Sequence, residues 1–288
     1  MSVGILPIGT SSFWVSPDQQ VASWGLPGHG ASKGDCGSFF SVGCIHVEDH
    51  FRGRIDGEDV IGKAFVRRKK VSCKEPKCPV CYESWAGREA HRIEHRILSF
   101  RLRGARAIHF MVSPPPEVWH LSVDRLRTKA YSVARKVGFL GGNCIYHPFR
   151  EVEETKLWYF SPHFHMIGYG WIKGAGEEYL TSGWVSKNLG VRDSVYATAF
   201  YQLSHCGVWY GVGRRHSVTW FGKLSYNKLK ADPEVVEKEV CPLCGAELRK
   251  LLWGGGGALP VPIDVEGDYF LDPEGWREAS ARYRYQNV

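Results

Sequence analysis

The apolar residues of region 83–103 recur at steps of four, three, four and three, which predicts a helix with one buried face. The members of this apolar stripe are Ala86, Ala90, Ile93, Ile97 and Phe100. Three arginines follow the i, i+4 spacing of neighbours on one helix face. We therefore expect Arg88, Arg92 and Arg96 to point away from the stripe, on a common line.

Elsewhere the pattern alternates between strands and helices. Period-two alternation predicts strands at 108–112, 145–149, 157–169 and 218–221. Apolar spacing predicts helices at 126–137 and 193–206, the second capped by Asp193 or Ser194. Region 1–35 is rich in Gly, Ser and Pro and is expected to be loop, and 254–257 reads as a flexible joint before an acidic tail. Short strands and helices in mixed order predict an α+β fold.

The amino-acid composition is that of an ordinary globular protein and does not by itself indicate a function. The 288 residues are 43% apolar and 23% charged, which is ordinary for a globular chain. No apolar run is long enough to span a bilayer, and region 1–15 lacks the pattern of a signal peptide. We therefore expect a cytoplasmic protein without a membrane partner. No phosphate-binding loop for ATP is present.

The positive charge is concentrated in one stretch of the chain. The net charge is +7, and 63–106 holds thirteen Lys or Arg against four Glu. Such a segment is the electrostatic footprint expected for phosphate contact, although a solvated helix face can look the same.

Four of the nine cysteines form two Cys-x-x-Cys pairs, a pattern that in a cytoplasmic chain favours zinc over disulfides. Cys73, Cys78 and Cys81 have zinc-ligand spacing. Candidates for their fourth ligand are Cys44 or Cys36 and, with less support, His46 or His91.

A second pair, Cys241 and Cys244, forms a typical zinc knuckle with Gly245. Its partners stay open, with His216 and Cys206 as candidates. Cys144 lies on a predicted strand and is expected in the core.

The sharpest chemical feature is a pair of histidines in an apolar strand. His163 and His165 should point to one face, about 7 Å apart along the strand. Two imidazoles placed in this way can share a divalent ion. On the helix at 193–206, Tyr201 and His205 lie within about 40° of each other, whereas Tyr196 is turned about 140° away from Tyr201 and is expected in the core.

Together these motifs resemble those of the HUH endonucleases, and among them the replication initiators of archaeal plasmids and viruses. The resemblance rests on His163-Phe164-His165 and on Tyr201, about forty residues later. Segments 108–113, 201–208 and 220–226 also look like family motifs in the expected order. The resemblance covers roughly residues 73–245. One departure is that the tyrosine motif lacks a lysine that many relatives have.

The resemblance implies an antiparallel central sheet with flanking helices, to which the cysteines add small zinc-binding modules. It suggests an N-terminal region with a cysteine cluster and basic helix (1–104), a nuclease core (105–230), and a C-terminal zinc knuckle and tail (231–288). The implied activity is nicking of single-stranded DNA that initiates rolling-circle replication through a 5′-phosphotyrosine linkage to Tyr201. The implied metal is Mn²⁺ or Mg²⁺.

The third metal ligand stays open at this point. His205 is favoured, because some family members place a ligand one turn beyond the tyrosine. An acidic residue before the histidine pair is the alternative, namely Glu151, Glu153 or Glu154. Origin DNA, a host helicase and a polymerase would be partners, since the chain has no motor.

A transposase or relaxase would use the same chemistry. A non-catalytic zinc-ribbon protein that binds nucleic acid is the alternative from another class. It would account for the cysteines and the basic segment, but not for the histidine pair and Tyr201.

Overall fold

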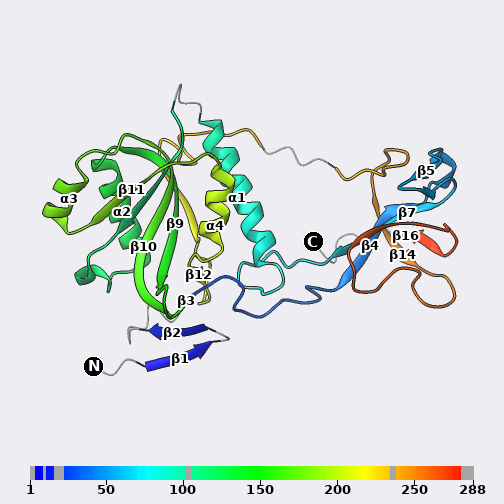
Figure 1. Cartoon of the computed structure of the whole chain (residues 1–288), viewed down its shortest axis with the longest axis horizontal. Coiled ribbons are helices and arrows are strands. Elements are labelled where there is room, and N and C mark those ends of the chain that lie inside the picture. Colours follow the sequence, from blue (N-terminus) through cyan, green and yellow to red (C-terminus); the bar gives the residue numbers. More distant parts are fainter. Residues whose placement is uncertain (1–3, 9–10, 16–22, 101–104, 234–237, 280–288) are drawn as a thin grey trace. The chain divides into compact units, whose positions relative to one another are not determined.

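A computed structural model describes residues 4–8, 11–15, 23–100, 105–233 and 238–279. The chain divides into two compact units, each built from two segments. Unit 1 comprises residues 1–32 and 74–234, and unit 2 comprises residues 33–73 and 235–288. This division differs from the expected three consecutive domains, because the two segments of unit 2, which lie before and after the second segment of unit 1, pair with each other in one sheet. The basic helix and the strands that carry the histidine pair belong to the same unit (Figure 1).

Unit 1 contains a mostly antiparallel seven-stranded sheet. Its central strands are β9 (Phe139–Glu151) and β10 (Trp158–Gly170), which pair along most of their length. Next to β10 lie β8 (Ile108–Ser113) and then β11 (Val185–Val191), while β13 (Val218–Gly222) pairs with β9. The predicted α+β class with an antiparallel sheet is confirmed.

Two short strands extend this sheet near the start of the chain. β1 (Gly4–Ile8) pairs with β2 (Ser11–Val15), and β2 runs parallel to the beginning of β10. β3 (Trp24–Gly25) pairs with β12 (Val208–Trp209). The expectation of loop alone over 1–35 was therefore wrong, since these strands are stabilised by pairing with distant segments.

Helices cover both faces of the sheet. On one face, Phe164 and Met166 of β10 pack in a core with helix α2 (Val123–Lys136). The other face packs against α1 (Tyr82–Ser99) and α4 (Val195–Leu203). Because side chains alternate along β10, His163 and His165 point to this second face. The short helices η2 (Pro116–Val118) and α3 (Ala175–Ser182) lie in connections.

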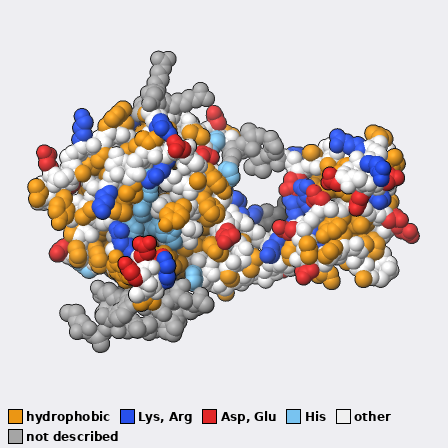
Figure 2. All heavy atoms as spheres, viewed as in Figure 1, with side chains coloured by type: hydrophobic (Ala, Val, Ile, Leu, Met, Phe, Trp, Pro, Cys, Tyr) orange, Lys and Arg blue, Asp and Glu red, His pale blue; other side chains and the backbone are white. Residues whose placement is uncertain are grey.

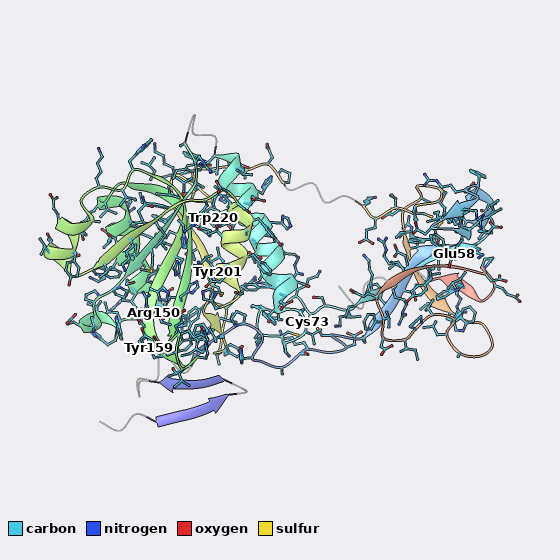
Figure 3. The ribbon with its side chains drawn as sticks, in the orientation of Figure 1. Glu58, Cys73, Arg150, Tyr159, Tyr201 and Trp220 are labelled. Carbon is cyan, nitrogen blue, oxygen red and sulfur yellow. The ribbon has the colours of Figure 1, made fainter. Side chains whose placement is uncertain are left out.

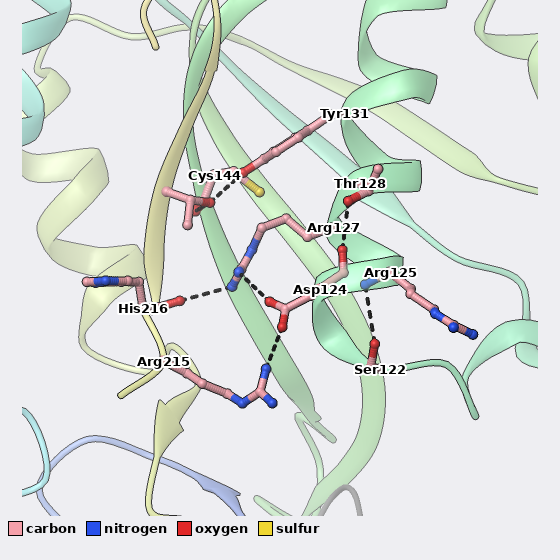
Figure 4. Close-up of polar contacts among 10 residues, drawn as sticks. Ser122, Asp124, Arg125, Arg127, Thr128, Tyr131, Cys144, Arg215 and His216 are labelled. Atoms are coloured by element: carbon pink, nitrogen blue, oxygen red, sulfur yellow. Dashed lines mark hydrogen bonds and ion pairs between the residues drawn. The ribbon is translucent and has the colours of Figure 1, made fainter. Parts of the chain in front are cut away.

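A buried arginine, Arg127, links α2 to the segment just before β13 (Figure 4). Arg127 is 8% exposed and donates to the carbonyl oxygen of His216 at 2.9 Å. It also pairs with Asp124, whose second carboxylate oxygen accepts from Arg215. The contact fixes the segment before β13 against α2.

The apolar stripe predicted for α1 is confirmed, with one correction among its arginines. Ala86, Ala90, Ile93 and Ile97 are buried. Arg92 is exposed, but Arg96 is 8% exposed and does not point outward. Each i, i+4 step rotates by about 40°, so Arg96 lies about 80° from Arg88 and is carried toward the buried face.

Arg96 bridges α1 to the segment after β13. Its Nε and Nη2 donate to the carbonyl oxygens of Leu224 and Leu229 at 2.9 and 2.8 Å. Its guanidinium carbon lies 4.3 Å from the ring centroid of Tyr226 and 5.2 Å from that of Trp220. These contacts make Arg96 a structural residue.

Arg96→Ala should therefore destabilise unit 1 by about 2–4 kcal/mol, because one buried and one partly buried carbonyl lose charged donors. For a unit of this size the expected fall in melting temperature is roughly 5–15 °C, measured by calorimetry. Arg92→Ala is the matched control on the same helix and should change the melting temperature little. Equal melting temperatures for Arg96→Ala and the wild type would contradict this role.

Unit 2 is a five-stranded antiparallel sheet in the order β15 (Gly267–Leu271), β7 (Ala64–Lys70), β4 (Phe39–Cys44), β14 (Arg249–Trp253) and β16 (Trp276–Glu278). Both faces hold an apolar cluster, one around Phe65 and one around Val66. Residues 267–278 thus belong to a folded sheet and not to an acidic tail. A hairpin of β5 (Arg54–Ile55) and β6 (Glu58–Asp59) and the turn η1 (Val47–Asp49) lie between β4 and β7.

No helix in the part of the chain that the structure describes is both long and apolar enough to cross a membrane.

Candidate metal centre and tyrosine

Three histidines from the two central strands of unit 1 meet on the face covered by α1 and α4. His163 lies directly opposite His147 in the antiparallel pair of β10 with β9. With His165 they offer three ligand atoms that all lie within 4.8 Å of one another. His147 is completely buried, and His163 is 4% exposed. The group could hold a metal ion.

Hydrogen bonding leaves nitrogen atoms available at this centre. Nδ1 of His163 lies 2.8 Å from the carbonyl oxygen of Ser161. A carbonyl can only accept, so Nδ1 carries the proton and Nε2 keeps its lone pair. Nδ1 of His165 contacts Nε2 of His109 at 2.7 Å.

His147 has neither of its ring nitrogens paired within the described residues. Leaving a buried polar group without a partner costs about 1–3 kcal/mol. A bound ion would satisfy one nitrogen, so the three residues fit a metal.

Burial keeps these imidazoles neutral. It lowers the pKa of His163 to about 3 and that of His109 to about 4, in both cases with a contribution from a nearby arginine. Burial and neighbouring histidines lower the pKa values of His147 and His165 well below the ordinary value. At neutral pH their nitrogen lone pairs are therefore available to a cation. A set of three imidazoles favours transition metals such as Zn²⁺ over Mg²⁺, which prefers oxygen ligands.

His205, the favoured third ligand in the sequence, lies beside this trio and not within it. Helix α4 ends at Leu203, and His205 follows in the turn. Its ring centroid is 4.7 Å from that of His147. Its Nδ1 contacts the Ser204 hydroxyl at 3.3 Å.

The acidic alternatives do not join the trio either. Glu151 forms an ion pair with Lys156. Glu153 and Glu154 are exposed in the turn between β9 and β10.

His147 was missed as a candidate ligand although its strand was predicted. Alternation along 145–149 places it on the same face as Ile145, but its partner strand and register could not be read from local sequence. The available signal was a histidine in the apolar strand immediately before the histidine pair.

Tyr201, labelled in Figure 3, lies on α4 at the surface, and its ring neighbour is His205. Its side chain is 65% exposed, and its ring centroid is 4.8 Å from that of His205. The hydroxyl of Ser194 caps α4 by accepting from the backbone N–H of Ala197, as one of the two predicted caps. Tyr196 instead packs on α1, with its ring 4.4 Å from that of His91. The structure thus brings Tyr201, His205 and the trio into one continuous set of rings.

The surface around the site is rich in basic side chains. Figure 2 shows histidines gathered at one place on unit 1, with Lys and Arg side chains around them and some acidic ones nearby. Arg88 is half-buried and Arg92 is exposed on α1, where Arg92 pairs with Glu89.

Unit 2 holds a separate group of possible zinc ligands. Cys44, His50, Cys241 and Cys244 offer four ligand atoms within 4.8 Å of one another. The sulfur atoms of Cys44 and Cys244 are 3.7 Å apart, and Nε2 of His50 is 3.5 Å from the sulfur of Cys241. Nδ1 of His50 lies 2.7 Å from the carbonyl oxygen of Lys63, which leaves Nε2 as the ligand atom.

The grouping differs from the partners considered in the sequence. Cys44 and His50, not His216 or Cys206, lie beside the knuckle pair, because β4 pairs with β14. Cys206 is buried in the core of unit 1, as is Cys144.

The other predicted cysteine cluster is divided between the units. Cys78 and Cys81 belong to unit 1, and Cys36 and Cys73 belong to unit 2, where the backbone N–H of Cys73 donates to the Cys36 sulfur at 3.4 Å. The group of Cys44, His50, Cys241 and Cys244 in unit 2 could hold zinc.

Comparisons of this chain with protein-family models, with curated proteins and with solved structures found no match in any of the three. A functional assignment therefore depends on the chemistry of the site's own residues.

Proposed function

We propose that unit 1 is a metal-dependent endonuclease that nicks single-stranded DNA with Tyr201 and initiates rolling-circle replication of a plasmid or virus. The observation that supports it most is the juxtaposition of an exposed tyrosine, one ring away from three clustered histidines. The sequence motifs in HUH order agree with this placement. The antiparallel sheet with helices on both faces is compatible with an HUH-like fold.

The proposed chemistry is a transesterification. His147, His163 and His165 would hold the divalent ion, which the family resemblance gives as Mn²⁺ or Mg²⁺. When bound, the ion polarises the scissile phosphate and offsets its negative charge. The Oη atom of Tyr201 bonds to phosphorus as the bond to the 3′ oxygen breaks, and the phenol proton leaves while the 3′ oxygen gains one. The phosphodiester energy is retained in the linkage, so rejoining needs no ATP.

The exposure of Tyr201 supports this role, because a nucleophile must reach a strand that arrives from solution. Arg88 and Arg92 are candidates for phosphate contacts that position the DNA. Under this proposal the protein works in the cytoplasm on origin DNA, and a host helicase and polymerase extend the free 3′ end. A transposase or relaxase remains a variant with the same chemistry.

The test is incubation of the protein with single-stranded DNA from its own replicon and Mn²⁺, followed by denaturing electrophoresis. The expected result is a covalent protein–DNA species that fails to form in EDTA. Binding of DNA without any covalent species, over a range of sequences and metals, would favour the non-catalytic nucleic-acid-binding alternative.

The group in unit 2 is proposed to hold one structural zinc ion through Cys44, His50, Cys241 and Cys244. Its support is the sulfur–sulfur distance, which suits tetrahedral coordination, and the fixed tautomer of His50. Zinc in unit 2 would join two segments that are far apart in the chain.

Metal analysis by mass spectrometry tests the zinc proposal for unit 2. The double variant Cys241→Ala/Cys244→Ala should contain one zinc ion fewer per chain than the wild type, and its unit 2 should lose protection from proteolysis. Cys206→Ala is the control and should retain the full zinc content. A zinc content that is unchanged in the double variant would refute the site.

A further inference from the structure

Arg150 is a cation beside the histidine trio that has no carboxylate partner. It is half-buried on β9. Its Nε donates to the hydroxyl of Ser161 at 3.1 Å, and its Nη2 donates to the hydroxyl of Ser113 at 3.0 Å. Within the described residues it forms no ion pair, since the adjacent Glu151 pairs with Lys156. A half-buried guanidinium with only neutral partners favours the arrival of an anion.

The geometry places Arg150 on the histidine face of the sheet. Met111 pairs with His165 across β8 and β10, so both side chains point to the same face. Nη2 of Arg150 lies 3.7 Å from the sulfur of Met111, and the guanidinium therefore lies on that face. After burial, the positive charge of Arg150 is the next largest cause that lowers the pKa of His163. Arg150 is thus close enough to act on the same ligand as His163.

The hydrogen bonds of Arg150 leave a donor available. Nε and Nη2 are held by the two serines, which orient the guanidinium plane. Nη1 forms no hydrogen bond to a described residue and is not enclosed. A planar donor fixed in this way is suited to a phosphate oxygen, because little side-chain freedom is lost on binding.

We propose that Arg150 binds the scissile phosphodiester, with Nη1 donating to a non-bridging oxygen while the histidine trio faces the same group. This role rests on the proposed nuclease function and adds a residue to it. A divalent ion, three neutral imidazoles and a guanidinium would leave a net positive charge, which the negative phosphodiester partly offsets. The contact strengthens as negative charge develops on the equatorial oxygens during attack.

The first test compares Arg150→Ala with the wild type in single-turnover nicking at saturating DNA. The rate should fall by about 100-fold, the usual cost of removing one donor to developing charge. Arg135→Ala is the matched control, since Arg135 is exposed on α2, which covers the opposite face. Mn²⁺ affinity, measured by calorimetry, should not decrease, because Arg150 is not a ligand and repels the cation.

A second readout needs neither the metal nor catalysis. The affinity for a single-stranded oligonucleotide in EDTA is measured by fluorescence anisotropy at several salt concentrations. Arg150→Ala should reduce the log–log salt slope by about 0.7, the value for one lost phosphate contact, whereas a structural role would leave the slope unchanged. Arg150→Lys keeps the charge but not the fixed plane, and should nick about 10-fold more slowly than the wild type.

The outcomes separate the two proposals. If the wild type forms no covalent species, the nuclease function fails, and the salt slope alone decides whether Arg150 contacts phosphate. If the wild type nicks and a folded Arg150→Ala keeps both its rate and its slope, Arg150 has no such role. If Arg150→Ala does not fold, Arg150→Lys decides, and a wild-type nicking rate in that variant overturns the inference.

Discussion

Tyr201→Phe is expected to abolish the covalent protein–DNA species while DNA affinity changes less than twofold. The substitution removes a single oxygen atom from a side chain that is 65% exposed, so no core packing is lost. The phenol oxygen is the only atom that can form the linkage, which makes the expected loss complete within detection. The measurement is denaturing electrophoresis of labelled oligonucleotide with Mn²⁺, together with anisotropy for binding.

Tyr196→Phe is the matched control, because the same atom is removed from the same helix. The ring of Tyr196 stacks with those of His91 and Phe200 and does not contact His205. This variant should form the adduct at the wild-type rate. Loss of the adduct in Tyr196→Phe, with retention in Tyr201→Phe, would mean that the nucleophile has been assigned to the wrong tyrosine.

The second large effect concerns the third metal ligand. His147→Ala should weaken Mn²⁺ binding by more than about 100-fold, since loss of even an outer contact to a ligand costs 10- to 100-fold. Nicking at micromolar Mn²⁺ should disappear with it. His147 is fully buried with both nitrogens unpaired among the described residues, so a bound ion is the partner that explains its position. Calorimetric titration with Mn²⁺ and the adduct assay measure the two effects.

The variant His205→Ala shows whether His147 or His205 is the third metal ligand. It should weaken Mn²⁺ binding far less than His147→Ala, because His205 lies outside the group of ligand atoms. His120→Ala, on the surface of unit 1, controls for the loss of an imidazole. If His205→Ala removes the metal and His147→Ala does not, the sequence-based choice of His205 is restored.

Local pattern was sufficient for the elements that hold the tyrosine and the histidine pair. Alternation along β10 predicts that His163 and His165 share a face, and helical geometry separates Tyr201 from Tyr196. Both follow from residues that are neighbours in the chain. The pairing of His147 with His163 depends on the register of β9 against β10, which local pattern does not determine.

The sheet of unit 2 was not predicted from the local sequence pattern. β7 has apolar clusters on both faces at Phe65 and Val66, so it lacks the alternation of a half-buried strand. Its neighbour β4 pairs with β14, which lies some two hundred residues later. The burial of Arg96 was not predicted for a different reason. Its carbonyl partners at Leu224 and Leu229 come from a distant segment of the chain.

The pairing of β4 with β14 also sets an order of events during synthesis. Cys44 and Cys244 are 200 residues apart, and all of the second segment of unit 1 lies between them. At about 5–20 residues per second, a ribosome needs on the order of 10–40 s to make that stretch. During this interval β4 can pair with β7 but has an open edge on its other side, and the knuckle that completes the zinc group does not yet exist. Unit 1 can therefore complete its sheet on the ribosome while the first segment of unit 2 is still without its second segment. A chain that stops before Val240 leaves the open edge of β4 exposed to other chains.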